Sequence, residues 1–163
     1  AVWIAALTAA LMPVERLVEP DRAEGVLDQL SLAGMAEESV ALAKAAAHWL
    51  SFGPLMMLAA LPAGALLRLD STALLRTEVA LLVGTPGLAA LAVTIAAVTA
   101  GLPRAGALAG LLLFPLAVPL LIFAAAFSSD GEPSALLFAA AVSLGLCALT
   151  PFAAGAAIRA TRT

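Results

Sequence analysis

Four stretches of this chain are long enough and apolar enough to cross a lipid bilayer, and this feature restricts the possible fold more than any other. They cover residues 39–67, 79–102, 105–127 and 134–158. A hydrocarbon core about 30 Å thick needs about 20 consecutive apolar residues in a helix. Hydrophobic residues make up 63% of the chain and charged residues 12%, whereas soluble domains average about 45–50% and about 25%. We therefore predict an all-α, polytopic transmembrane helical bundle that forms one domain, residues 1–163.

A fifth apolar run, residues 1–14, is too short to span a bilayer alone. It carries neither a basic region nor a small-residue cleavage site, so it lacks the marks of a signal peptide. We interpret it as the remainder of a longer membrane helix that is truncated at its N-terminus. The chain is thus expected to contribute five membrane helices.

A single hydrophilic stretch interrupts this pattern. Nine of the nineteen Asp, Glu, Lys and Arg residues lie between Glu15 and Glu38, and we call residues 15–38 the polar segment. Asp21 followed by Glu24 resembles a capping box, and apolar residues follow at helical spacing. We predict one short amphipathic helix from Asp21 to about Ala33; a loosely structured connecting loop at the interface is the alternative. Gly25 within the predicted helix indicates either a close backbone approach or an imperfect helix, and Gly34 is the expected stop.

The basic residues indicate the orientation in the membrane. If the predicted helices alternate in direction, six basic residues lie on one side of the membrane and only Arg68 and Arg76 lie on the other. On that second side, a short loop containing Asp70 and Glu78 is expected to precede the helix that starts at residue 79. The positive-inside rule makes the first side cytoplasmic, so the polar segment and its partner are expected there. The six residues are Arg16, Arg22, Lys44, Arg104, Arg159 and Arg162.

Several function classes are excluded by what the sequence lacks. A net charge of −3 gives no electrostatic footprint for nucleic acid. No phosphate-binding GxxxxGK[ST] motif occurs, so this chain is not expected to hydrolyse ATP itself. The one cysteine, Cys147, rules out CxxC sites, and the one histidine has no HExxH companion. We predict a non-catalytic protein with no metal site.

Lys44, His48 and Trp49 are candidates for a ligand site or an interface near the cytoplasmic boundary. Lys44 and His48 are spaced i and i+4 and share a helix face. They could contact an anionic ligand, or His48 could be an axial ligand to haem. Alternatively, Lys44 extends to the interface and His48 bonds a neighbouring carbonyl. One histidine cannot supply both axial ligands, so no haem is expected to be bound by this chain alone.

Glycine and proline in mid-membrane mark expected helix kinks at Pro86, Pro115 and Pro119. Because such residues free backbone carbonyls that must be satisfied within the protein, these faces are expected to point toward other helices or a cavity. Two interpretations stay open at this point. The small residues of Gly84–Gly87 could serve close helix packing, or the kinks could face a substrate.

The sequence resembles the CcmB family, the membrane permease subunit of the haem-handling ABC transporter in system I cytochrome c maturation. The resemblance covers nearly the whole chain, in order, although residues 31–38 depart from the family pattern. The matching motifs are VWIAAL at 2–7, ERL at 15–17, EGVLDQL at 24–30, LAKAAAHW at 42–49, GTP at 84–86, LFPLAVPLLIF at 113–123 and PFAAGAAIR at 151–159.

The resemblance implies a six-helix permease of the bacterial inner membrane, in which one further helix precedes this chain. It also implies that the polar segment docks on a separate ATPase subunit, CcmA, in a complex with CcmC, CcmD and the haem chaperone CcmE, and that two permease copies are present. Haem would be a transported or handled ligand. A structural scaffold and a generic ABC-2 exporter are the alternatives. The expected coupling residues are Glu15, Arg16, Glu24, Gly25, Leu27, Asp28, Gln29 and Leu30.

Overall fold

The computed structural model describes residues 2–12 and 14–161. Every regular element in these residues is a helix, which confirms the predicted all-α membrane bundle. Four helices are long and apolar enough to cross a membrane, and α1 is a shorter apolar helix. The long ones are α5 (Glu37–Leu66), α6 (Ser71–Thr99), α7 (Ala105–Asp130) and α8 (Pro133–Ala160). The others are α1 (Val2–Leu11), α2 (Val14–Leu17), α3 (Glu19–Ala23) and α4 (Val26–Leu32).

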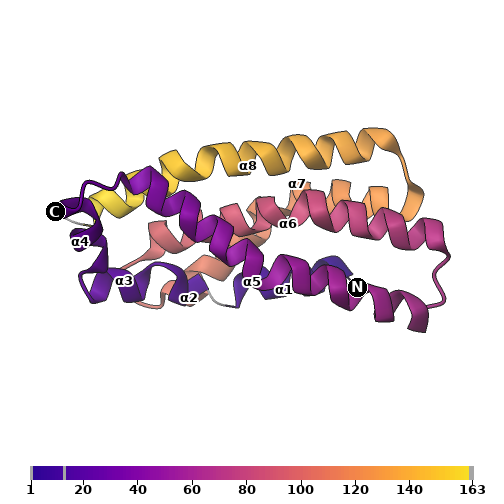
Figure 1. The fold of residues 1–163 in the computed structure, drawn as a ribbon, viewed down its shortest axis with the longest axis horizontal. Helices are drawn as coiled ribbons and strands as arrows, with labels where there is room; N and C mark the ends of the chain where they lie inside the picture. Colours follow the sequence, from indigo (N-terminus) through magenta and orange to yellow (C-terminus); the bar gives the residue numbers. More distant parts are fainter. Residues whose placement is uncertain (1, 13, 162–163) are drawn as a thin grey trace.

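The long helices run along the length of an elongated bundle (Figure 1). At one end lie α3, α4, the turn between α6 and α7, and the C-terminal end of α8; we call this the polar end. The α5–α6 and α7–α8 turns lie at the opposite end. The described chain begins partway along the bundle and runs through α1 toward the polar end. Arg162, one of the six basic residues that indicate the orientation in the membrane, lies outside the described residues.

Helix α6 forms the centre of the bundle. In its most apolar 18-residue window 72% of the residues are buried, against 22–28% in the other three long helices. Small residues allow this burial, because α6 approaches its neighbours closely at two glycines. A Cβ on Gly87 would stand 2.8 Å from the Ser143 Cα of α8, and a Cβ on Gly84 would stand 2.8 Å from the Trp3 ring of α1. The packing interpretation of Gly84–Gly87 therefore fits the structure.

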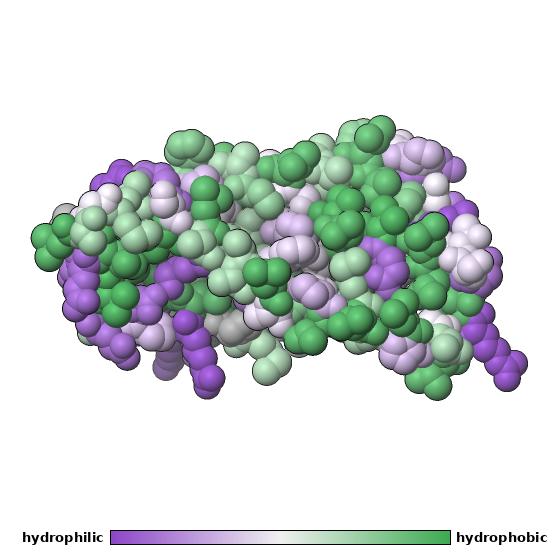
Figure 2. Space-filling model, in the orientation of Figure 1, coloured by the Kyte–Doolittle hydropathy of each residue, from purple (hydrophilic) through white to green (hydrophobic). Residues whose placement is uncertain are grey.

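The remaining long helices expose leucine and phenylalanine side chains to the surroundings of the bundle. Leu111, Phe114, Leu144 and Phe152 are more than half exposed, although they are large and apolar. Figure 2 shows mainly apolar and weakly polar residues over the middle of the visible face, whereas most of the strongly hydrophilic residues lie toward its two ends. This distribution is what a bilayer requires, because lipid tails solvate apolar side chains and water solvates the ends.

Two expectations about the long helices are wrong in detail. Helix α6 begins at Ser71 rather than 79, because the Asp70 carboxylate accepts a hydrogen bond from Ala73 N (2.7 Å) and caps the helix. Arg76 and Glu78 are therefore helical and not part of a loop.

Pro115 and Pro119 lie inside α7 and are exposed, so they do not face the other described helices as expected. Pro86 lies inside α6 and is partly buried. The kinks themselves stay predictions.

Candidate functional site

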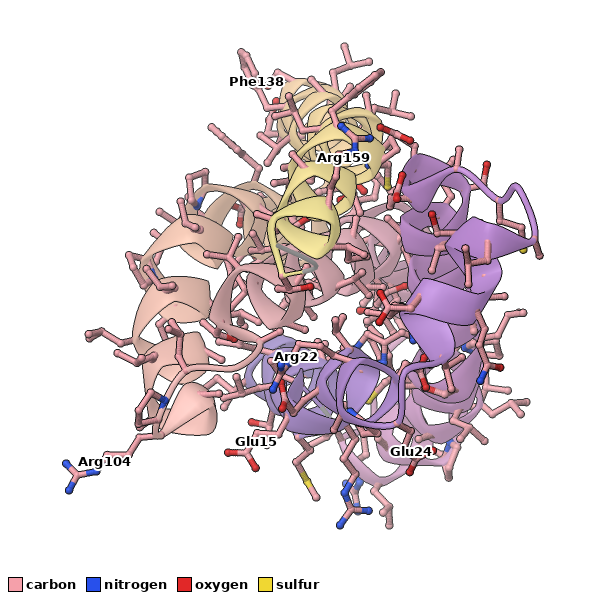
Figure 3. The ribbon with its side chains drawn as sticks, turned by 90° about the vertical axis from the view of Figure 1, so that its left-hand side faces the viewer. Glu15, Arg22, Glu24, Arg104, Phe138 and Arg159 are labelled. Atoms are coloured by element: carbon pink, nitrogen blue, oxygen red, sulfur yellow. The ribbon has the colours of Figure 1, made fainter. Side chains whose placement is uncertain are left out.

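The polar segment folds against the polar end of the bundle as three short helices, α2, α3 and α4. Figure 3 looks onto this end and shows Glu15, Arg22, Glu24, Arg104 and Arg159 distributed around it. Charged side chains from α3, from the first residues of the polar segment, from the α6–α7 turn and from α8 are therefore gathered on one surface. The contacts that fasten this surface to the bundle define the candidate site.

The predicted single helix from Asp21 to Ala33 is wrong, because the chain breaks it at Gly25. Gly25 has φ of 73°, and it precedes α4 as its N-cap. A Cβ at Gly25 would meet nothing within 4 Å, so an imperfect helix, and not a close backbone approach, accounts for this glycine. Asp21 is not an N-cap either: it lies inside α3, which begins two residues earlier.

The C-terminal end of α4 is closed by a Schellman motif. Gly34 takes φ of 83°, which confirms it as the helix stop. Its N–H donates to Ser31 O (2.9 Å), and the Met35 N–H donates to Leu30 O (3.0 Å). These bonds satisfy two carbonyls that the helix would leave free. The end of α4 is consequently held in one conformation.

Glu19 connects α3 to the turn between α6 and α7. Its carboxylate accepts two hydrogen bonds from the Arg22 guanidinium, 2.6 and 3.0 Å long. It also accepts one from Gly101 N at 2.7 Å. The hydrogen bond from Arg22 is the main reason that the pKa of Glu19 lies below its ordinary value, and the Gly101 amide acts in the same direction. A displacement of α3 would therefore also displace the α6–α7 turn or break this hydrogen bond.

Lys44 fastens the segment to α5. Its Nζ donates to Leu17 O (2.7 Å) and forms an ion pair with the Asp21 carboxylate. These contacts occupy the ammonium group, so it does not simply extend to the interface. Lys44 instead holds the junction of α2 and α3 against the first part of α5.

Glu15 lies against the first turn of α7. A Cβ on Gly106 would stand 1.6 Å from Glu15 Oε1, so the carboxylate fits only because position 106 has no side chain. A carboxylate near a helix N-terminus also interacts favourably with the helix dipole. The start of α2 is therefore adjacent to α7.

An acidic pair at the start of α5 connects the segment to α8. Arg159 Nη2 lies 2.5 Å from Glu38 Oε1 and 3.6 Å from Glu37 Oε2. Gly155 permits this approach, since a Cβ there would stand 3.1 Å from Glu38 N. The sequence reasoning used Arg159 only for orientation and missed this contact. The sequence signal for this contact was the pair of carboxylates, Glu37 and Glu38, at the start of a helix.

His48 and Trp49 are occupied by contacts within the bundle. The His48 side chain is 3% exposed, and its Nε2 lies 3.0 Å from Ala10 O, near the end of α1. Because a carbonyl only accepts, Nε2 must carry the proton. Trp49 Nε1 donates to Thr85 Oγ1 (2.9 Å) on α6. The two side chains point to different helices and do not form one ligand site.

The expected coupling residues divide into exposed and buried ones. Leu27 is only 4% exposed and belongs to the core, whereas Leu30 is partly buried against that core. Leu32, which the sequence reasoning did not select, is 88% exposed. The residues of the expected set that are exposed are Glu15, Arg16, Glu24, Asp28 and Gln29.

The described flanks of the bundle carry three apolar grooves and one pocket of about 260 Å³ whose lining includes the hydroxyl-bearing residues Thr77, Ser128 and Ser129. One groove of about 200 Å³ between α5, α6 and α8 is lined by apolar residues including Trp49, Pro86 and Cys147. Two others, of about 310 and 270 Å³, flank α1. Nowhere among the described residues do three or more His, Cys, Asp or Glu side chains gather as metal ligands. The polar end is therefore the strongest candidate site.

Comparison with known proteins identifies relatives over almost the whole chain. The family described as "CcmB protein" matches residues 1–161. The chain is 42% identical over 164 residues to "Heme exporter protein B" of Rhodobacter capsulatus, covering 96% of this chain and 74% of that protein. It is 43% identical over 162 residues to the protein of that name in Paracoccus denitrificans, with the same coverage. For Escherichia coli strain K12 the identity is 39% over 163 residues, covering 97% and 74%.

Proposed function

The chain belongs to the CcmB protein family, and from this premise we propose that it is the permease subunit of a haem-exporting ABC transporter. In this proposal ATP is hydrolysed by a separate subunit, CcmA, which docks on the polar segment. The membrane is the bacterial inner membrane, with the polar end in the cytoplasm. CcmC, CcmD and the haem chaperone CcmE complete the complex, and two permease copies serve two ATPase subunits.

One observation supports the proposal: at one end of the bundle the polar segment contacts α5, the turn between α6 and α7, and α7. Its last two residues, which begin α5, pair with α8. Lys44 connects it to α5, and Glu19 connects it to the turn that joins α6 and α7. Glu15 lies against the start of α7, and the segment's last residue, Glu38, is paired with Arg159 of α8. A partner that displaces the segment would therefore act on the whole bundle, which is what a coupling element has to do.

The same contacts suggest what each residue does during a cycle. Glu19 and Lys44 act as ties, because each joins the segment to a different part of the bundle through hydrogen-bonded charges. His48 keeps the end of α1 attached to α5. The haem path itself is left open, since the apolar grooves carry no converging polar groups.

A complementation assay tests the function. The full-length protein is expressed in a bacterium that lacks its own heme exporter protein B, and c-type cytochromes are detected by their covalently bound haem. Restored cytochrome maturation is the expected result. If CcmA co-purifies but no holo-cytochrome forms, the chain exports something else, as a generic ABC-2 exporter would. If CcmA does not co-purify, the proposed subunit role is wrong.

A further inference from the structure

Leu32 is a large apolar side chain that the bundle does not cover. It is 88% exposed, more than any other large apolar residue that the structure describes. It is the last residue of α4, outside the four membrane-crossing helices. In Figure 1, α4 lies at the extreme of the polar end. Met35, three residues later, is 42% exposed.

Hydrogen bonds hold the backbone around Leu32 in one conformation before any partner binds. The Schellman motif that ends α4 holds Leu30, Ser31, Gly34 and Met35 by two hydrogen bonds. Leu27 anchors the opposite face of α4 in the core. A side chain presented on such a support loses little freedom when a partner covers it, and this is what favours tight docking.

The charge around Leu32 selects between two kinds of partner. The polar segment has seven acidic and two basic residues, a net charge of −5. Two of its carboxylates pair with basic residues outside the segment, Asp21 with Lys44 and Glu38 with Arg159. The exposed charged residues beside and within α4 are both acidic, Glu24 and Asp28. The cytoplasmic leaflet of a bacterial membrane is anionic and attracts basic segments, so it does not favour these two carboxylates. A protein surface with an apolar cleft bordered by basic side chains would match both the leucine and the surrounding charge.

We propose that Leu32, with Met35, is the side chain that docks into such a basic-bordered apolar cleft on CcmA. The inference rests on the proposed function, since it names the contact through which the ATPase subunit binds. It also replaces Leu27 and Leu30 as the apolar contacts. The exposed acidic residues Glu24 and Asp28 of the polar segment would face the basic border of the cleft.

Association with CcmA tests the proposal. The full-length protein is purified with CcmA in detergent, and the affinity is measured for Leu32→Ala, Leu32→Asp and Glu24→Lys. Truncation of a buried leucine is expected to weaken binding about tenfold or more, and Leu32→Asp is expected to abolish it. Glu24→Lys should weaken binding at low salt more than at high salt. Leu67→Asp is the matched control, because Leu67 is 63% exposed at the opposite end.

The outcomes separate this inference from the proposed function. If the unchanged protein binds CcmA and Leu32→Asp binds equally well, the Leu32 contact is wrong and the subunit role stands. If the unchanged protein does not bind CcmA, the proposed function itself fails. Because Leu32 is exposed, its variants should fold, and helical content measured by circular dichroism checks this.

Insertion of Leu32 into the membrane is the competing outcome. A polarity-sensitive dye is attached to Leu32→Cys in a Cys147→Ala background, and the protein is placed in vesicles that contain anionic lipid. A blue-shifted emission without CcmA would overturn the proposal. An emission typical of water, which shifts to the blue only when CcmA is added, supports it.

Discussion

Replacing Gly87 by alanine should destabilise the bundle, although alanine is the better helix former. A Cβ at position 87 would stand 2.7 Å from Ser143 Oγ and 2.8 Å from Ser143 Cα. Because the Cα belongs to the backbone of α8, a side-chain rotation cannot relieve the contact, and α6 and α8 must separate. Overpacking of this kind costs about 1–3 kcal/mol.

Gly145→Ala is the matched control, because a Cβ at Gly145 of α8 would meet nothing within 4 Å. Both substitutions gain up to about 1 kcal/mol of helix propensity. This gain cancels in the comparison, so the two variants should differ by the packing cost alone, about 1–3 kcal/mol. The measurement is unfolding of the full-length protein in detergent, followed by tryptophan fluorescence. Equal stabilities would refute the close contact and revive the interpretation of Gly84–Gly87 as a substrate-facing kink.

Two further predictions concern Glu19 at the polar end and His48 between α1 and α5. Because the pKa of Glu19 is lowered in the folded protein, its stabilising effect is full above the unfolded pKa and disappears as the pH falls through the folded one. The protection of the Gly101 amide against hydrogen exchange should follow this acid transition, and Glu19→Gln should remove the transition; an unchanged profile would contradict the contact. His48→Ala should cost about 1–3 kcal/mol by leaving Ala10 O unpaired, with partial rescue by His48→Gln. If the α1 amides exchange as slowly in His48→Ala as in the unchanged protein, the hydrogen bond to Ala10 O contributes nothing.

The membrane-crossing helices could be predicted from the sequence, because the length of an apolar run reports directly on the bilayer. Their ends could not be found in the same way. Helix α6 begins eight residues earlier than expected, at a capping aspartate, Asp70. A cap is a local hydrogen bond and leaves no trace in hydropathy, although the aspartate before a helical stretch was a usable signal.

The internal structure of the polar segment differs from the prediction, and its last two residues, Glu37 and Glu38, already belong to α5. The cost of one glycine within a helix, about 1 kcal/mol, does not say whether the helix continues or breaks. In the structure Gly25 breaks it. Leu27 and Leu32 both lie in α4, five residues apart and therefore on different sides of the helix, so Leu27 can face the core while Leu32 is exposed. The ties through Glu19 and Lys44 join residues far apart in sequence, so no local pattern could reveal them.

The central claim is that the polar segment transmits movement from the ATPase subunit to the membrane helices through its ties. The most direct measurement uses the double variant Glu19→Ala and Lys44→Met in the full-length protein, with CcmA binding and c-type cytochrome maturation recorded on the same preparation of cells. Coupling energies of about 1–3 kcal/mol correspond to about 5- to 150-fold effects. We expect CcmA to stay bound while maturation falls at least fivefold, by that estimate. Full maturation with CcmA bound would contradict the claim and favour a structural scaffold.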